Sequence, residues 1–569
     1  MLVASGFGAG AQPVSDPPDI ASAEEIESPG ASPTPTSAAE SSREAQIEQL
    51  RAVLSERRFE RELEESRFET VQDHQRQRGL IPWRFALVVA TVPLVIWGLV
   101  APAAAPRARR WRQVAWALLA LVSIASFFRF SLTDRIRDDM QIKDVYHYYI
   151  GGKYSAEIGY GRLYDCTVAM AHQQGRWWVD QLDTIRNLQT MSARPAAEIA
   201  TRGIAECRSR FSTERWNQFG TDLAWFFDRM KGPTWRWMLN DHGFNPSPIW
   251  TVLATPLTNT TTAEDLRLLV QIDSLLILAA LASIGWAFGF EAMCLAAIVW
   301  GTGFLWRYAW VGDAFLRQIW FSAAVIGVSC LRRGHAFTAG ALLATSAGVR
   351  LFPAAFLGGY ALFALRRFRE TRVWSREDRR FAAGVSIAAV SLVVASLVLA
   401  GRGIEDYGRF AHNTTVLREL IIKNLAGFEA LLWRIDGTTS LYWRNEVGPG
   451  LIGLDLSTAL RFGVAAGSIL WFWFATRRVE SWEAAALGFA LIPLLTSPPG
   501  YYFHFVVLAV PLCVHRPSIA VWLLAACGAW QINGFLWRDL GEQFTVASIV
   551  ALVLSCAVLA TMRRPAQPI

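Results

Sequence analysis

The sequence predicts an all-α polytopic membrane protein with about 11–13 transmembrane helices. Hydrophobic residues make up 53% of the 569 residues and charged residues only 18%, which is too apolar for an ordinary soluble protein. Apolar runs of about 18 residues or more recur from residue 83 almost to the C-terminus. The net charge of +7 comes from arginines clustered between these runs, which indicates membrane topology and no nucleic-acid partner.

The N-terminal segment differs in composition from the rest. Residues 1–42 are rich in Pro, Ser, Ala and Gly, and we expect them to be disordered. Residues 43–80 are charged and place Ile47, Leu50 and Leu54 on one helical face before the apolar stripe fades. This pattern favours a solvated helix, with a coiled coil as the alternative.

Residues 81–565 form the predicted transmembrane domain. One pair of apolar segments, around "GVRLFP", is too short for two independent spans, so we expect two half-helices meeting at Arg350 and Pro353, or one broken hairpin. The apolar segments lie near residues 83–104, 112–131, 266–289, 291–309, 314–331, 336–349, 351–365, 382–401, 458–476, 482–496, 501–514, 517–536 and 543–562.

The arginine clusters orient these segments. "PRARRWRQ", "LRRGH", "LRRFRETRVWSREDRR", "TRRVE" and "MRRP" all fall on one side when the spans alternate, and the positive-inside rule makes that side cytoplasmic. The hydrophilic loops 132–263 and 402–457 then face outward. Nearly all of the 55 basic Lys and Arg residues are arginines, which indicates a GC-rich bacterial genome and hence a bacterial inner membrane.

Two of the seven cysteines, Cys166 and Cys207, share the first outer loop. In a bacterium this loop faces an oxidising compartment, so we expect a disulfide, with two buried thiols as the alternative. The other five lie in apolar segments and are expected to be small apolar residues.

The stretch "KDVYHYYIGGKYSAEIGYGRLYDC", residues 143–166, places a carboxylate next to an outward-facing span. Asp144 begins an aromatic, half-apolar segment, which we interpret as an amphipathic helix lying on the membrane. A carboxylate held there next to a lipid head group can act as a general base. The loop ends with "HGFNPSPIWTVLATPL", where the prolines exclude a regular helix at the start and the apolar remainder indicates a short helix.

These stretches resemble the GT-C glycosyltransferases, in particular the polyprenol-phosphate-mannose-dependent mannosyltransferases of glycosyltransferase family 87. The first is similar to their loop pattern of Asp, an apolar residue, a variable residue and Tyr-Tyr, ending in Gly-x-x-x-Tyr. "FNPSPIWTVLATPL", "RRGHAFTAGALLATSAGVRLFPAAFL" and "TSPPGYYFHFVVLAVPL" follow in the family's order, over roughly residues 112–515. The chain departs from the family at Asn245–Pro248, in a Trp-rich insert around 176–240 and in its extra first span and tail.

The resemblance implies a GT-C-like bundle and transfer of mannose or a related sugar from a polyprenyl phosphate to a lipid or glycan acceptor. Asp144 would be the base, and inversion is expected because no second carboxylate is evident as nucleophile. Tyr148 and Tyr149 match the family's tyrosine pair and would contact sugar or acceptor, as would His412 and Asn413 in "YGRFAHNTT". A lipid-phosphate donor needs cations near the membrane boundary, and the candidates are Lys153, Arg317, Arg350, Arg409 and His504.

Two other classes of function use the same features. A transporter or flippase of lipid-linked sugars needs the same cations, although such proteins often repeat a broken helix in corresponding halves and this chain shows one clear break. A noncatalytic scaffold is the other alternative. The sequence contains no P-loop, no dinucleotide-binding fingerprint and no zinc spacing, so we expect neither a cofactor nor a metal.

Overall fold

The computed structural model describes residues 35–100, 106–131, 140–399, 403–419, 423–435 and 454–564. Residues 1–34, which are predicted to be disordered, and most of the tip of the second outer loop lie outside the described residues. The chain divides into two compact units, residues 1–54 and 55–569.

Helix α1, Pro35–Val100, passes through that boundary and joins the charged segment to the first apolar run in one helix of 66 residues. Residues 35–42, which were expected to be disordered, belong to this helix. Pro82 and Pro93 lie inside the helix. Membrane helices tolerate such prolines because neighbouring groups can satisfy the freed backbone carbonyls.

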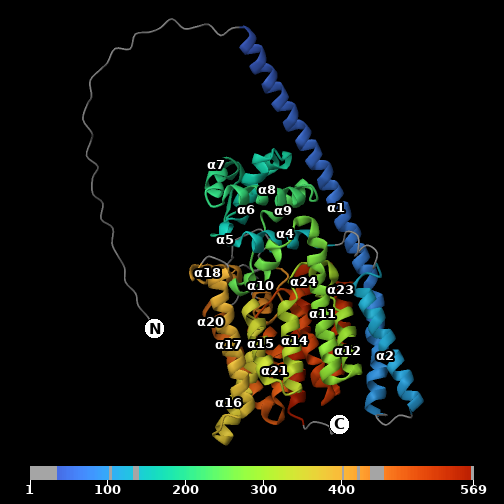
Figure 1. Ribbon diagram of the computed structural model, residues 1–569. Coiled ribbons are helices and arrows are strands. Elements are labelled where there is room, and N and C mark those ends of the chain that lie inside the picture. Colours follow the sequence, from blue (N-terminus) through green and yellow to red (C-terminus); the bar gives the residue numbers. More distant parts are fainter. Residues whose placement is uncertain are drawn as a thin grey trace. The chain divides into compact units, whose positions relative to one another are not determined.

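The larger unit is an all-α, polytopic membrane protein. By length and composition, six of its described helical segments can cross a membrane, and five shorter apolar ones accompany them. Figure 1 shows these helices side by side in one bundle. The expectation of 11–13 spans in a GT-C-like bundle stays a prediction. The bundle helices are α2 (Pro106–Phe127), α11 (Leu266–Phe288), α12 (Phe290–Gly301), α14 (Ile319–Arg332), α15 (Ala336–Val349), α16 (Ala354–Thr371), α17 (Arg376–Leu399), α20 (Leu454–Ala475), α21 (Ser481–Leu487), α22 (Ile492–Leu495), α23 (Ser518–Leu536) and α24 (Leu540–Met562).

Four of the expected apolar segments are less regular than predicted, and one of them, near 482–496, consists of α21, the 3₁₀ helix η4 (Gly488–Leu491) and α22. The segments near 291–309 and 314–331 are interrupted by a buried stretch, residues 302–318, that contains only the one-turn helix α13, Tyr308–Val311. The segment near 501–514 is 3₁₀-helical, in η5 (Gly500–Ala509) and η6 (Pro511–Val514). Irregular backbone of this kind is stable in a membrane protein only where other protein surrounds it. The remaining short elements here are α18 (Glu405–Glu419), α19 (Phe428–Ile435) and η3 (Thr476–Arg478).

The first outer loop folds into a helical layer over one end of the bundle (Figure 1). The described part of this loop contains one hairpin, in which β1 (Thr184–Arg186) pairs antiparallel with β2 (Ala193–Pro195) and Ile185 lies opposite Arg194. A disulfide joins Cys166 on α6 to Cys207 on α7, with Cα atoms 5.5 Å apart, so the expected pairing is the one found. The elements are α4 (Ile142–Lys153), α5 (Ser155–Ile158), α6 (Leu163–Gln173), η1 (Trp177–Gln181), β1 (Thr184–Arg186), β2 (Ala193–Pro195), α7 (Ala196–Arg208), α8 (Thr213–Phe227), α9 (Gly232–Met238), α10 (Pro248–Asn259) and η2 (Ala263–Asp265).

The sequence suggested that α4 is an amphipathic helix lying on the membrane. In the structure, other parts of the protein cover this helix. Every residue from Val145 to Lys153 is buried. The Trp-rich insert provides the cover: Trp178 and Trp235 stack with centroids 5.1 Å apart, and Trp235 contacts the Tyr146 ring edge-on at 5.3 Å. The insert is therefore the core of the outer layer.

The charged part of α1 is also not simply solvated. Phe59 is buried, and Glu62 accepts a hydrogen bond from the backbone N–H of Gly232 at 2.8 Å. Lys231 pairs with Glu65 and Glu69 at 3.1 and 2.9 Å. Glu62, Glu65 and Glu69 belong to the charged pattern that predicted a solvated helix. In the structure they bind this part of α1 to the Trp-rich insert.

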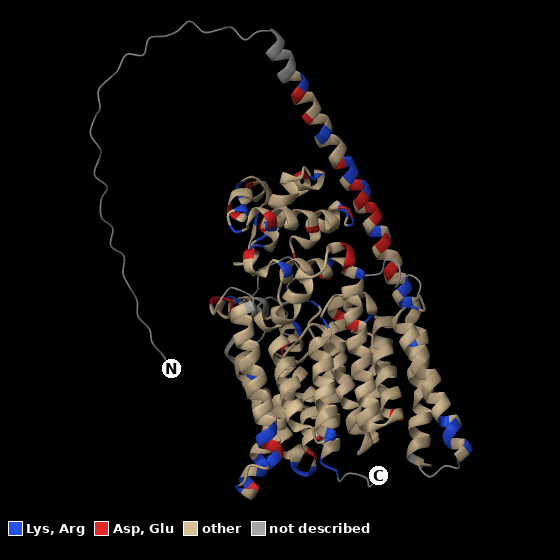
Figure 2. Ribbon diagram, in the orientation of Figure 1, with Lys and Arg blue, Asp and Glu red and all other residues tan. Residues whose placement is uncertain are grey.

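The arginine clusters lie at the end of the bundle that is opposite the outer layer (Figure 2). Contacts link them there: Arg112 pairs with Glu291 at the start of α12, and Arg332 pairs with Glu480 before α21. Arg366 at the end of α16 donates to Thr476. These clusters therefore lie at one end of the bundle.

Candidate functional site

Helix α4 places Asp144 at the boundary between the outer layer and the bundle. The carboxylate stands in the first turn of the helix, where the helix dipole favours a negative charge. Gly151 and Gly152, near the C-terminal end of α4, have no side chains, so neighbouring segments can approach the helix backbone closely there. A Cβ on Gly151 would come within 2.4 Å of the Phe244 ring, so this glycine lets the segment before α10 pack directly against α4.

Asp144 forms an ion pair with Arg317, which lies just before α14. Asp144 Oδ2 is 2.9 Å from Arg317 Nη1, and the same nitrogen donates to the carbonyl of Trp310 at 2.6 Å. The Asp144 side chain is 34% exposed, whereas that of Arg317 is 7% exposed. Burial lowers the pKa of Arg317, but the Asp144 carboxylate and the three neighbouring tyrosines, Tyr148, Tyr501 and Tyr502, together more than offset this effect, so the net shift is upward and the guanidinium stays charged.

Asp273 on α11 fixes the backbone that carries Arg317. Its two carboxylate oxygens accept hydrogen bonds from the backbone N–H groups of Arg317 and Gln318, at 3.1 and 3.0 Å. The two preceding residues, Phe315 and Leu316, have φ values of 49° and 54°, in the left-handed region that side chains disfavour. Strained backbone of this kind persists where surrounding contacts hold it, and it is common at functional sites.

Arg350 approaches the same place from the break between α15 and α16, which is the break the sequence predicted. Its Nη2 donates to the Tyr148 hydroxyl at 2.8 Å, and its Nη1 lies 3.5 Å from the carbonyl of Asn245. Ser247, the residue that caps α10, donates to the Gly348 carbonyl at 2.6 Å. The motif before α10 is thereby bonded to the helix break.

Three tyrosines form the wall between the two arginines. The Arg317 guanidinium carbon lies 5.8 Å from the Tyr148 ring and 5.2 Å from the Tyr501 ring, and that of Arg350 lies 5.4 Å from the Tyr502 ring. We call this group the Asp144 site. Its six members are Asp144, Tyr148, Arg317, Arg350, Tyr501 and Tyr502.

The sequence identified four members of the Asp144 site and missed the other two. Tyr501 and Tyr502 stand in the "PPGYYFH" stretch, from which His504 was chosen instead. A tyrosine pair directly after two prolines at a predicted membrane boundary was the available signal.

His504 lies behind the tyrosines. It is buried, and its Nδ1 donates to the Tyr501 carbonyl at 2.9 Å, because a carbonyl can only accept. Its ring packs against Trp300, Trp320 and Phe321 at 5.0, 4.8 and 4.9 Å. The structure therefore places His504 as a support for the Tyr501 backbone within an aromatic cluster.

Lys153 and Tyr149 belong to a different, buried network. Lys153 Nζ lies 2.8 Å from Asp222 Oδ2 and donates to the Tyr149 hydroxyl at 2.8 Å and to the Thr261 carbonyl at 3.0 Å. Tyr154 donates to the same Asp222 oxygen at 2.7 Å. Burial and then the Asp222 charge raise the pKa values of Tyr149 and Tyr154, so both remain hydrogen-bond donors. The network ties α4 to α8 and leaves Lys153 no open donor face.

The remaining candidates lie on α18. Arg409 is exposed and 3.6 Å from Glu405, one turn away on the same helix. His412 is exposed and Asn413 is buried. Within the described ranges, none of these three side chains forms a hydrogen bond or an ion pair with a member of the Asp144 site.

The electrostatic balance of the Asp144 site favours an anion. Two guanidinium groups face one carboxylate, and within the described part of the chain Arg350 has no carboxylate partner. The described residues also contain no group of three or more His, Cys, Asp or Glu side chains that could hold a metal ion. The arrangement can hold a phosphate beside the Asp144 carboxylate.

Comparisons with known proteins leave the site to be interpreted on its own geometry. A scan against protein-family models, a search of curated proteins and a search of solved structures each found no match.

Proposed function

We propose that the protein is a membrane glycosyltransferase that transfers mannose or a related sugar from a polyprenyl-phosphate donor to a lipid or glycan acceptor on the extracytoplasmic face. The observation that carries this proposal is the convergence of Arg317 and Arg350 on one tyrosine wall beside Asp144. These residues come from three elements far apart in the sequence. They supply a phosphate-binding pair of cations and a candidate base at one end of a membrane bundle.

The two arginines suit a leaving group that consists of one phosphate. Guanidinium groups donate in a fork that matches phosphate oxygens, and such hydrogen bonds strengthen as charge develops on the leaving group. Arg317 is held rigidly through Asp273, and Arg350 through Tyr148 and Asn245. Preorganised donors of this kind need no rearrangement during the reaction.

Asp144 is the group placed to accept the proton of the acceptor hydroxyl. Its Oδ2 accepts a hydrogen bond from Arg317 Nη1 at 2.9 Å. A phosphate bound between Arg317 and Arg350 would share the Arg317 charge, which frees Asp144 to act as the base. The hydroxyl oxygen then forms the new bond to the anomeric carbon, the bond from that carbon to the phosphate oxygen breaks, and the phosphate leaves with the electron pair.

The carboxylates that the structure describes around Arg317 favour a single displacement. Asp273 is buried and both of its oxygens accept backbone hydrogen bonds, so it is not available as a nucleophile. A double displacement with retention needs two carboxylates that flank the anomeric carbon, about 5 Å apart. We therefore propose an inverting reaction with Asp144 as the one acting carboxylate.

Two observations support an outward-facing site in a bacterial inner membrane. The arginine-rich end of the bundle is the opposite end from the Asp144 site (Figure 2), and arginines concentrate on the cytoplasmic side. The layer on the side of the Asp144 site contains the disulfide between Cys166 and Cys207, a bond that persists in oxidising compartments.

The direct test uses the purified full-length protein with radiolabelled polyprenyl-phosphate mannose and lipids and glycans extracted from a bacterial cell envelope. Label transferred to an extracted acceptor, and lost in Asp144→Asn, is the expected result. If the full-length protein binds the donor but transfers no label, the proposed enzymatic activity is contradicted. Movement of the donor across a vesicle membrane without cleavage would establish a flippase instead.

A further inference from the structure

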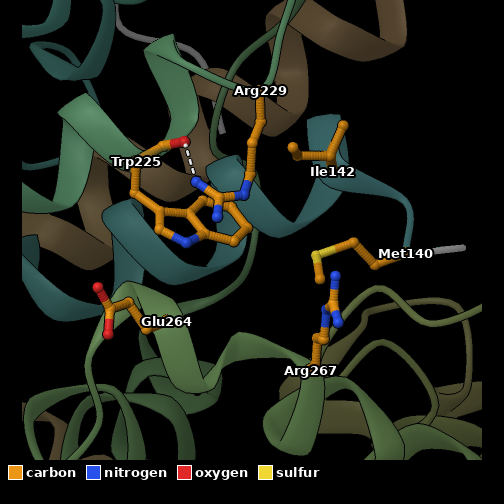
Figure 3. Close-up of a pocket in the computed structure, with 6 residues that line it drawn as sticks. All are labelled: Met140, Ile142, Trp225, Arg229, Glu264 and Arg267. Atoms are coloured by element: carbon orange, nitrogen blue, oxygen red, sulfur yellow. Dashed lines mark hydrogen bonds between the residues drawn. The ribbon is translucent and has the colours of Figure 1, made fainter. Parts of the chain in front are cut away.

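A cavity of about 570 Å³ opens where the outer layer meets the first turn of α11. Figure 3 shows six side chains around it, which come from the start of α4, the end of α8, η2 and α11. They are Met140, Ile142, Trp225, Arg229, Glu264 and Arg267.

This cavity is separate from the Asp144 site. Ile142 lines the cavity and Asp144 faces Arg317, and two residues along a helix correspond to about 200° of rotation. The two sites therefore lie on opposite sides of the first turn of α4.

The polar lining suits a phosphate with a hydrogen-bond donor attached. Arg229 stacks on Trp225, with its guanidinium carbon 3.9 Å from the ring, and donates one N–H to the Trp225 carbonyl at 3.2 Å. A guanidinium held in this way keeps the donors along its edge for a ligand. Arg267 adds a second cation, and Glu264 adds one carboxylate that can accept from a hydroxyl or ammonium group (Figure 3).

The position of the cavity points to a lipid. Glu264 and Arg267 belong to the first turns of a segment, Ala263–Phe288, that is long and apolar enough to cross the membrane. Below them, Leu268, Leu275 and Leu278 are 74%, 64% and 57% exposed. Exposed leucines at this helical spacing provide an apolar track along which an acyl chain can lie.

We propose that this cavity binds the headgroup of a bilayer phospholipid, with the phosphate on Arg229 and Arg267 and a headgroup hydroxyl or ammonium on Glu264. Met140 and Ile142 cover the glycerol end, and the acyl chains follow the exposed leucines of α11. The proposal does not depend on glycosyl transfer, because it is tested by binding alone. Because Met140 and Ile142 lie four and two residues before Asp144 in the chain, an occupied cavity would also hold the start of α4.

The experiment measures lipid binding to the delipidated full-length protein in detergent, by native mass spectrometry and titration. The probes are phosphatidylglycerol, phosphatidic acid, diacylglycerol and inorganic phosphate. We expect phosphatidylglycerol to bind at least about tenfold more tightly than diacylglycerol, which lacks the charge-assisted hydrogen bonds. We expect inorganic phosphate to compete only weakly, because it lacks the chains.

Variants then locate the bound lipid. The double variant Arg229→Gln/Arg267→Gln should lose at least about tenfold in affinity for phosphatidylglycerol, because charge-assisted hydrogen bonds are about twice as strong as neutral ones. Glu264→Gln should reduce the ratio of the affinity for phosphatidylglycerol to the affinity for phosphatidic acid. Arg202→Gln is the matched control, because Arg202 is 76% exposed and pairs only with Glu198 on its own helix in the described structure.

Three results would overturn the proposal. Equal affinity for diacylglycerol and phosphatidylglycerol would mean that the headgroup is not recognised. Inorganic phosphate that displaces the lipid at comparable concentration would assign the cavity to a soluble anion. Unchanged lipid binding in a folded Arg229→Gln/Arg267→Gln protein would place the lipid elsewhere, and the comparison of the four probes on the wild type stands even if that variant does not fold.

Discussion

Asp144 Oδ2 and Arg317 Nη1 lie 2.9 Å apart, and the two ends of this ion pair have different surroundings. The Arg317 side chain is almost fully buried and is bonded to the Trp310 carbonyl, whereas a third of the Asp144 side chain is open. An arriving acceptor can therefore reach the carboxylate, while the guanidinium stays in place. In the proposed reaction this pair is the resting state of the base.

The first prediction concerns Asp144→Asn. Asparagine keeps the size of the side chain but cannot take the proton, so turnover should fall by about 10²–10⁴-fold while donor binding is retained. Labelled donor binding and single-turnover transfer measure the two effects separately. Asp183→Asn is the control, because it breaks the exposed pair of Asp183 with Arg236 and should change neither quantity. Equal loss of donor binding and rate would make Asp144 a structural partner of Arg317 instead.

The second prediction concerns Arg350. Hydrogen bonds to charged groups contribute about 1.5–3 kcal/mol, so Arg350→Ala should weaken donor binding by roughly 10–100-fold. Arg350→Lys should recover part of this loss, since it keeps the charge but loses the fork. Arg409→Ala is the matched control, because Arg409 is exposed on α18 and should have no effect. Equal weakening in both alanine variants would remove the Arg350 assignment.

The sequence predicted some of these features because their signals are local. The break before Pro353 follows from two apolar segments that are each too short, and the short helix α10 follows from the Ser-Pro that caps it. The arginine clusters needed only the alternation of the spans. The first two features can be judged from a short stretch of sequence, and the third from the order of apolar segments and basic clusters along the chain.

Other features depend on partners distant in the chain. Lys153 stands nine residues after Asp144, which is about 13 Å along a helix, so its place in the same motif does not bring it to the same site. Its partner Asp222 is 69 residues away. The burial of α4 likewise depends on Trp178 and Trp235, which lie in the Trp-rich insert far along the chain from α4.

The third prediction tests the structural role of that network. Lys153→Met alone leaves Asp222 buried and uncompensated, which should cost about 3–5 kcal/mol of the free energy of unfolding. Adding Asp222→Asn should restore much of the loss, because the amide oxygen still accepts from Tyr154 and no charge remains. Thermal unfolding in detergent provides the measurement. The folded double variant should bind the donor normally, and a specific loss of donor binding would return Lys153 to the phosphate site.

The fourth prediction concerns topology. Cysteines introduced singly at Thr201, exposed on α7, and at Arg372, in the turn after α16, should react with a membrane-impermeant maleimide from opposite sides. In intact cells only the cysteine at 201 should be labelled, and the cysteine at 372 should react after permeabilisation. The reverse pattern would put the Asp144 site on the cytoplasmic side, where the disulfide would not be expected.

The last prediction concerns His147, one turn after Asp144 on α4. Its Nδ1 donates to the Lys143 carbonyl and its Nε2 accepts from the Tyr164 hydroxyl, both at 2.8 Å, so the ring is held in its neutral form. Burial lowers the pKa of His147, and although Asp241 and Asp144 act to raise it and Arg317 to lower it, the net shift is downward. The native state therefore takes up this proton at a lower pH than the unfolded chain does.

The sign of the pH effect follows from this difference. As the pH falls below about 6.5, the unfolded chain binds a proton on this histidine that the native state does not, so the free energy of unfolding decreases. The decrease stops once the pH is below the lowered native pKa. Melting temperatures of the wild type from pH 8 to pH 5 should show this loss. His147→Gln should be less stable at pH 8, because it disturbs the bond to Tyr164, but should lose less stability on acidification. An identical pH dependence in the two proteins would show that another group titrates. His172→Gln, on α6, is the matched control, and its melting temperature should depend on pH as that of the wild type does.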